Sequence, residues 1–168
     1  MKYADYKKYD LMNGEGMRNS LFVSGCTHHC KGCFNAVAWN FEYGKEFTKR
    51  VEDEIIADLN VPDKNIQGLS LLGGEPFDNV ESLLPFIRRV RKECLNSDIW
   101  CWSGYTYDEL LANNKEMLSL IDILVDGKFI LEERNLKLRF RGSNNQRIID
   151  VQQSLTQNRV VLWQEGNY

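Results

Sequence analysis

Short apolar segments that end in glycine-containing loops alternate along this chain with segments of helical periodicity. An apolar run closed by a glycine turn is typical of a buried strand, whereas apolar residues at every third or fourth position indicate a helix. Alternation of the two favours an α/β fold with a parallel sheet. We expect its strands at 21–23, 66–72, 98–102 and 121–125.

Three helices are expected between these strands. The first begins at a Thr48 cap and runs to Leu59. The second contains Pro85, which leaves its start open because proline disrupts helical hydrogen bonding beyond the first turn. The third covers 107–120. In the tail after Lys137, we expect extended segments at 139–141 and 159–163.

Right-handed crossovers between parallel strands bring the loops that follow these strands to one edge of the sheet. Ligands of α/β proteins bind at such an edge. Residues 1–168 are expected to form one domain, because a chain of this length suits a single core. The loops predicted at the edge are 26–33, 73–76, 102–104 and 126–127.

Three of the five cysteines lie in one loop, with the spacing C-x3-C-x2-C at Cys26, Cys30 and Cys33. In a reducing compartment, clustered thiolates indicate a metal centre and select zinc, copper(I) or iron–sulfur clusters. A 4Fe-4S cube bound by three cysteines leaves one iron without a protein ligand. A cofactor or substrate can bind at that iron.

Zinc is the alternative centre for this loop. Structural zinc takes four ligands, so His28, His29, Cys94 or Cys101 would have to complete the shell. We expect the two histidines to face solvent or to lie behind the ligands, and Cys94 and Cys101 to be small core residues. Three buried cysteines without metal are the other alternative. The 4Fe-4S cluster is the favoured interpretation.

The tetrapeptide Gly73-Gly74-Glu75-Pro76 follows the next expected strand. Alone, paired glycines before a proline predict only a turn. Adjacent parallel strands, however, would place this turn beside the cysteine loop. Glycine lets main-chain carbonyls approach an ammonium group closely, and Glu75 adds an acceptor or a negative charge.

The cysteine spacing followed by this turn resembles the radical S-adenosylmethionine superfamily. The resemblance implies that the open iron takes the amino and carboxylate groups of S-adenosylmethionine and that the 73–76 turn holds the amino group. A short chain whose substrate comes from outside is then expected to form an incomplete, partly open parallel (β/α) barrel.

Within this superfamily, the chain resembles the activating proteins of anaerobic ribonucleoside-triphosphate reductase over almost its whole length. Gly32 stands where much of the superfamily has an aromatic residue, and Phe34 follows the third cysteine, as in this branch. The resemblance rests on Arg18 and on the segments 13–16, 22–26, 32–35, 73–76, 102–105, 124–129, 141–143 and 145–146.

This family resemblance implies a function. An electron from a donor such as flavodoxin enters the cluster and splits S-adenosylmethionine into methionine and a 5′-deoxyadenosyl radical. That radical takes a hydrogen from a glycine Cα of the reductase, so no side chain is assigned as an acid or base. The implied contacts with S-adenosylmethionine are Gly32, Cys33, Phe34, Gly73, Gly74, Glu75 and Pro76.

Composition argues against two classes of partner. The formal net charge is −3 and the pI about 5.5, so no overall positive field favours a nucleic acid. No apolar run reaches the roughly 18 residues that cross a bilayer, and residues 1–16 lack the apolar stretch of a signal peptide. We expect a cytoplasmic protein without a membrane partner.

Other functions are compatible with the sequence. They are an activase of a different glycyl radical enzyme, a small radical enzyme acting on a modified base precursor, and a non-catalytic zinc-loop protein or electron carrier. A non-catalytic zinc-loop protein or electron carrier would not need the 73–76 turn. Arg139, Arg141 and Arg147 form a basic cluster that fits either an acidic patch on a partner or a solvated face.

Overall fold

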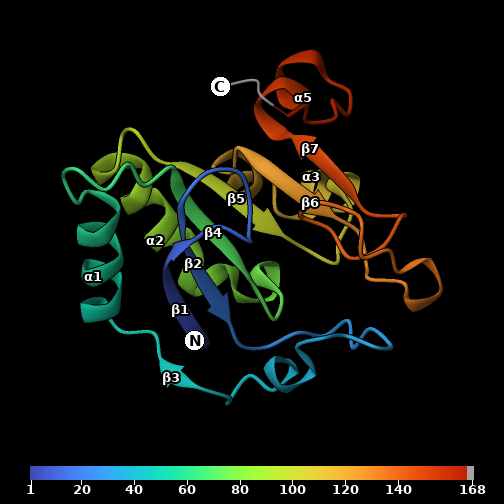
Figure 1. Ribbon diagram of the computed structural model, residues 1–168, viewed down its shortest axis with the longest axis horizontal. Helices are drawn as coiled ribbons and strands as arrows, with labels where there is room; N and C mark the ends of the chain where they lie inside the picture. The colour runs from blue at the N-terminus through green and yellow to red at the C-terminus, as the bar shows by residue number, and fades with distance from the viewer. Residues whose placement is uncertain (166–168) are drawn as a thin grey trace.

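The computed structural model describes residues 1–165, which form a mixed α/β structure around a seven-stranded sheet (Figure 1). The strands are β1 (Lys2–Asp10), β2 (Arg18–Val23), β3 (Lys45–Glu46), β4 (Gly68–Gly73), β5 (Asp98–Trp102), β6 (Ile123–Asp126) and β7 (Arg147–Asp150). Their order is β3-β1-β2-β4-β5-β6-β7. The pairs β2–β4, β4–β5 and β5–β6 are parallel, whereas β1, β3 and β7 run antiparallel to their neighbours.

Helices cover one face of this sheet. Side chains alternate along β4, so Leu69 and Leu71 join the core beneath the helices while Ser70 points to the opposite face. No helix in residues 1–165 is long and apolar enough to cross a membrane. The α-helices are α1 (Lys49–Leu59), α2 (Val80–Glu93), α3 (Tyr107–Asn113), α4 (Lys115–Ser119) and α5 (Val151–Gln157), and 3-10 turns lie at η1 (Ala36–Trp39), η2 (Pro76–Asn79) and η3 (Leu131–Glu133).

The four strands expected from the sequence are confirmed as the parallel centre of the sheet. The antiparallel strands β1, β3 and β7 are findings of the structure. The sequence of β1 is mostly polar, because β3 pairs only with Lys2 and Tyr3 and the strand buries only some of its side chains, Tyr3 and Tyr6 among them and only in part. The expected α/β class and open sheet are therefore confirmed, with antiparallel strands added on both sides of the parallel centre.

The helices agree with expectation except in detail. Thr48 occupies the N-cap position of α1, but its side chain makes no capping hydrogen bond. Pro85 lies inside α2, where it is exposed, so the carbonyl that lacks its amide partner can bond to water. The expected helix at 107–120 is interrupted at Asn114, where α3 ends and α4 begins.

The segment after Lys137 differs more from what the sequence predicts. Residues 139–141 are a loop, which corrects the expected strand, and Phe140 adopts a left-handed backbone with φ 60°. Within 159–163, Leu162 forms an isolated bridge with Ile149 of β7, and Trp163 N–H donates to the Ile148 carbonyl at 2.9 Å. This last segment is thus extended along β7.

The sequence predicts that the loops after the parallel strands meet at one edge of the sheet, and the structure confirms this. The arrows of β2, β5 and β6 in Figure 1 point to the same side, and the cysteine loop, the 73–76 turn and the loops after β5 and β6 follow there. Val23 lies opposite Gly73 in the parallel register, so the chain leaves β2 and β4 at one level.

At the other end of the strands, Arg18 is completely buried. Its guanidinium donates to Ser70 Oγ at 2.8 Å and to the Leu69 carbonyl at 3.0 Å, and it forms an ion pair with the Asp98 carboxylate. The ring of Trp100 lies 5.4 Å from the guanidinium carbon. Arg18 therefore joins β2, β4 and β5 where these strands begin.

Replacing Arg18 by alanine should lower the free energy of unfolding by about 3–5 kcal/mol, because it leaves Asp98 and main-chain carbonyls without their buried partner. Urea denaturation measures this loss. Arg88→Ala, which removes an exposed ion pair with Glu116, is the control and should cost less than about 1 kcal/mol. Equal losses in both variants would contradict the structural role of Arg18.

Candidate functional site

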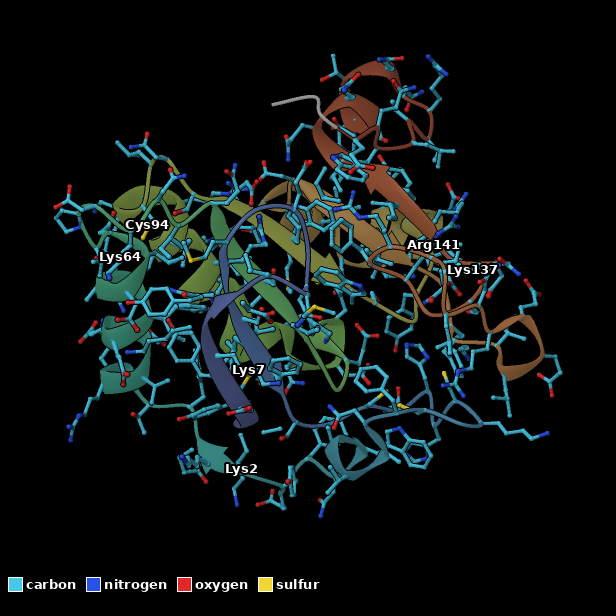
Figure 2. All side chains as sticks on the ribbon, viewed as in Figure 1. Lys2, Lys7, Lys64, Cys94, Lys137 and Arg141 are labelled. Carbon is cyan, nitrogen blue, oxygen red and sulfur yellow. The ribbon has the colours of Figure 1, made fainter. Side chains whose placement is uncertain are left out.

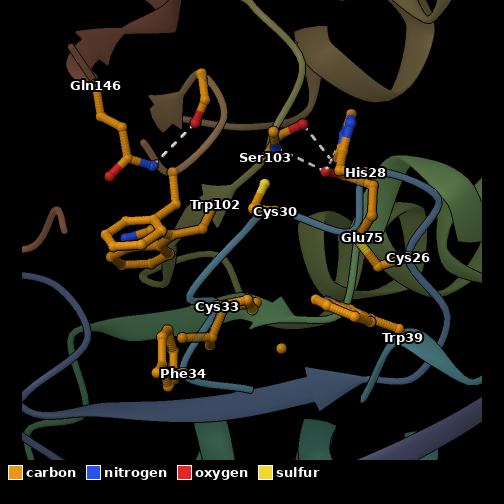
Figure 3. A pocket seen from close by; sticks show the side chains of 16 residues that line it. Cys26, His28, Cys30, Cys33, Phe34, Trp39, Glu75, Trp102, Ser103 and Gln146 are labelled. Carbon is orange, nitrogen blue, oxygen red and sulfur yellow. Dashed lines mark hydrogen bonds and ion pairs between the residues drawn. The ribbon is translucent and has the colours of Figure 1, made fainter. Parts of the chain in front are cut away.

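Loops at the carboxyl ends of β2, β4, β5 and β6 surround one pocket (Figure 3). The empty space in the pocket and at its open mouth has a volume of about 680 Å³. Among the residues assigned from the resemblance, Gly32 and Pro76 do not line it. The lining residues are Cys26, His28, Cys30, Cys33, Phe34, Trp39, Leu72, Gly73, Gly74, Glu75, Trp102, Ser103, Gly104, Gly127, Phe129 and Gln146.

The cysteine loop brings Cys26, Cys30 and Cys33 to this pocket, and all three are partly exposed free thiols. Cys26 N–H donates to the Trp39 carbonyl at 3.1 Å, which anchors the start of the loop, and Cys33 N–H donates to the Cys30 carbonyl at 3.1 Å, which closes a turn within it. Burial raises the pKa of the Cys26 thiol, an effect that the amides of His28 and His29 oppose and the charges of Glu75 and Asp78 reinforce.

In residues 1–165, no three His, Cys, Asp or Glu side chains converge on a single metal ion. Thiolates that bind a 4Fe-4S cube contact different irons, so this finding does not test a cluster. The other two cysteines lie elsewhere: Cys101 is in the core, and Cys94 ends α2 beside α1 (Figure 2). Three thiols on one loop at an open pocket suit a cluster that keeps one iron free.

Two glycines allow the 73–76 turn to approach the cysteine loop. Gly73 has φ +108°, and a Cβ there would lie 2.8 Å from the Phe22 Cα. A Cβ on Gly74 would lie 2.4 Å from the Gly25 carbonyl oxygen. Gly74 N–H donates to the Val23 carbonyl at 2.7 Å, which closes the turn onto β2. The paired glycines are thus needed for contact between the two loops.

Glu75 is 1% exposed, and its carboxylate joins three loops. Oε1 accepts from Phe77 N–H at 3.0 Å and from the Ser103 hydroxyl at 2.9 Å. Oε2 accepts from Gly104 N–H at 2.7 Å and lies 3.1 Å from His28 Nε2. Both oxygens are therefore engaged within the protein.

The two histidines have different surroundings. His29 is exposed, as expected, and its ring stacks on Trp39 at a centroid distance of 4.8 Å. The ring of His28 is buried between Glu75 and Tyr105, with the Tyr105 ring centroid at 4.3 Å. A solvent-facing His28 is therefore wrong, whereas a place behind the cysteines fits.

The loop after β6 closes the opposite wall. Gln146 Nε2 donates to the Gly127 carbonyl at 2.9 Å, as Figure 3 shows, and Phe129 lines the pocket. A Cβ on Gly32 would lie 2.9 Å from Leu131, so this glycine lets the loop lie against the cysteine loop. Phe34 remains 89% exposed at the mouth.

Each of the three tail arginines has a partner within the chain. Arg147 donates to Asp126 Oδ1 at 3.0 Å and to Oδ2 at 2.5 Å. Arg141 donates to the Gln146 carbonyl, and Arg139 pairs with Glu165. Arg141 and Arg147 therefore stabilise the loop after β6, whereas Arg139 remains exposed.

Comparison with known proteins defines the class first. The family model described as a 4Fe-4S single cluster domain matches residues 12–149. The chain is thus a member of a family of proteins that hold one iron–sulfur cluster, in agreement with three cysteines at one pocket.

Individual relatives identify the family more narrowly. The anaerobic ribonucleoside-triphosphate reductase-activating protein of Haemophilus influenzae is 51% identical over 87% of this chain and 96% of its own length. Proteins of the same name from Escherichia coli K12 and Enterobacteria phage T4 are 47% and 38% identical over 87% and 88% of the chain, and over 96% and 93% of their own lengths. The chain belongs to the family of anaerobic ribonucleoside-triphosphate reductase-activating proteins.

Gly104→Ala should lower the free energy of unfolding by about 1–3 kcal/mol, because overpacking displaces a buried side chain. The new Cβ would lie 2.3 Å from His28 Cδ2 and push the ring away from Glu75. Urea denaturation under anaerobic, reducing conditions measures the loss. The double variant Gly104→Ala/His28→Ala provides the space and should lose less than the sum of the single variants. Simple additivity would contradict the contact.

Proposed function

We propose that this protein activates anaerobic ribonucleoside-triphosphate reductase by reductive cleavage of S-adenosylmethionine at a 4Fe-4S cluster bound by Cys26, Cys30 and Cys33. The observation that supports it is the meeting of these cysteines with Gly73, Gly74 and Glu75 around one pocket. The names of the relatives supply the target protein. The expected product is a glycyl radical on the reductase.

The bound groups would supply a low-potential electron and a 5′-deoxyadenosyl radical. The chain's own residues would hold these groups and exclude water. Three cysteines would bind the cluster, and Cys33, Phe34, Gly73 and Gly74 would contact S-adenosylmethionine through main chain and ring. Gly32 and Pro76 would support these contacts from outside the pocket lining. No side chain serves as acid or base, since hydrogen-atom transfer needs none.

Glu75 has a defined part in this proposal. Its carboxylate accepts from two amides and one hydroxyl and faces His28, so these contacts use both of its oxygens. Main-chain carbonyls of the turn are then the acceptors for the cofactor's ammonium group, while Glu75 holds the turn against the loop after β5. Its negative charge still favours a cation nearby.

The open sheet also supports a protein substrate. We assign it to the incomplete barrel type of radical S-adenosylmethionine enzymes, with residues 1–168 as one domain. Strands β3 and β7 are its edges, so the sheet does not close on itself. The exposed ring of Phe34 marks the side from which the reductase's glycine would approach. An electron donor such as flavodoxin would act in the cytoplasm.

Protein purified and reconstituted without oxygen should contain iron and sulfide in equal amounts and should cleave S-adenosylmethionine when reduced. With the reductase present, electron paramagnetic resonance should show a glycyl radical doublet. Alanine at Cys26, Cys30 or Cys33 should abolish cleavage and radical formation, because each removes a cluster ligand. Cys94→Ala, in the buried cysteine at the end of α2, is the matched control and should retain both.

The outcomes separate the alternatives. One zinc per chain without iron would overturn the proposal in favour of a zinc-loop protein. Cleavage without a radical on this reductase, but with one on another glycyl radical enzyme, would reassign the partner and keep the chemistry.

A further inference from the structure

A second carboxylate, Asp78, contacts the cysteine loop outside the pocket. Its Oδ2 accepts from Thr27 N–H at 2.7 Å and from Thr27 Oγ1 at 2.9 Å. Its Oδ1 accepts from the Tyr105 hydroxyl at 2.9 Å. Thr27 follows Cys26 directly, so Asp78 fixes the main chain next to the first cysteine.

Asp78 is itself held in place. It lies in η2, the 3-10 turn that follows Glu75 and leads into α2. Its amide donates to the Glu75 carbonyl at 3.1 Å. Tyr105, its other partner, comes from the loop after β5 and packs its ring on His28. The carboxylate therefore connects the cysteine loop to two segments with fixed positions on the sheet.

We propose that Asp78 is a positioning residue that holds Cys26 in its cluster-binding place and sets part of the electrostatic field on the cluster. The inference rests on the proposed function, because it requires a cluster at the three cysteines. Groups behind metal ligands orient those ligands, and their loss typically weakens metal binding about 10- to 100-fold. The Asp78 carboxylate also lies within hydrogen-bond distance of the amide next to Cys26, so its negative charge is close to the first cluster ligand.

The two roles can be separated by two substitutions. Asp78→Ala removes the acceptors for Thr27 together with the charge. Asp78→Asn keeps an amide oxygen for Thr27 and turns its amide nitrogen towards Tyr105, whose hydroxyl oxygen can accept. Asparagine thus preserves position and removes only the charge.

The experiment uses the reconstituted full-length protein. Iron retention against a chelator should fall about 10- to 100-fold in Asp78→Ala and stay near that of the unchanged protein in Asp78→Asn. The reduction potential of the cluster, followed by electron paramagnetic resonance, should become more positive in Asp78→Asn, because a neighbouring negative charge opposes reduction. Asp108→Asn, at an exposed carboxylate in the first turn of α3, is the control and should change neither quantity.

Each result supports or overturns one of the two roles proposed for Asp78. Unchanged iron retention in Asp78→Ala, or an unchanged potential in Asp78→Asn, overturns the corresponding role of Asp78. If Asp78→Ala does not fold, the position is tested by Thr27→Val, which removes the hydroxyl bond to Asp78 and should weaken iron retention. Failure of the unchanged protein to bind iron would instead overturn the proposed function.

Discussion

Parallel pairing of β2 with β4 determines where chemistry can take place in this protein. Because Val23 lies opposite Gly73, both strands end at the same level and the cysteine loop meets the 73–76 turn. Glu75 N–H donates to the Gly25 carbonyl at 2.7 Å, a contact between the two loops themselves. A slip in this register would separate the thiols from the turn, whatever the residues in either loop.

The Glu75 carboxylate then holds these neighbouring loops in fixed positions around the pocket. Glu75 joins the turn to Ser103 and Gly104, and through His28 to the cysteine loop. Such a buried charge is tolerated because its hydrogen bonds replace those lost from water. The same contacts that satisfy the carboxylate also position the loops, so local stability and the shape of the pocket have a common origin.

The sequence predicted the parallel centre of the sheet and the edge at which the loops meet, because apolar runs and glycine turns report burial and chain reversal directly. It also singled out Cys26, Cys30 and Cys33 as one group. It did not predict β1 and β3, whose sequences are mostly polar, or β7, whose apolar run is only Ile148 and Ile149. Nor did it place Trp39 or Asp78, since their roles depend on contacts between segments distant in sequence.

The buried Arg18 and the pocket lie at opposite ends of the parallel strands. Arg18 ties three strands together where they begin, whereas the pocket lies where they finish. Residues in the distal loops can therefore diverge during evolution while the anchoring of the scaffold stays intact. Such a division lets one backbone acquire new partners or new reactivity through changes confined to its opposite rim.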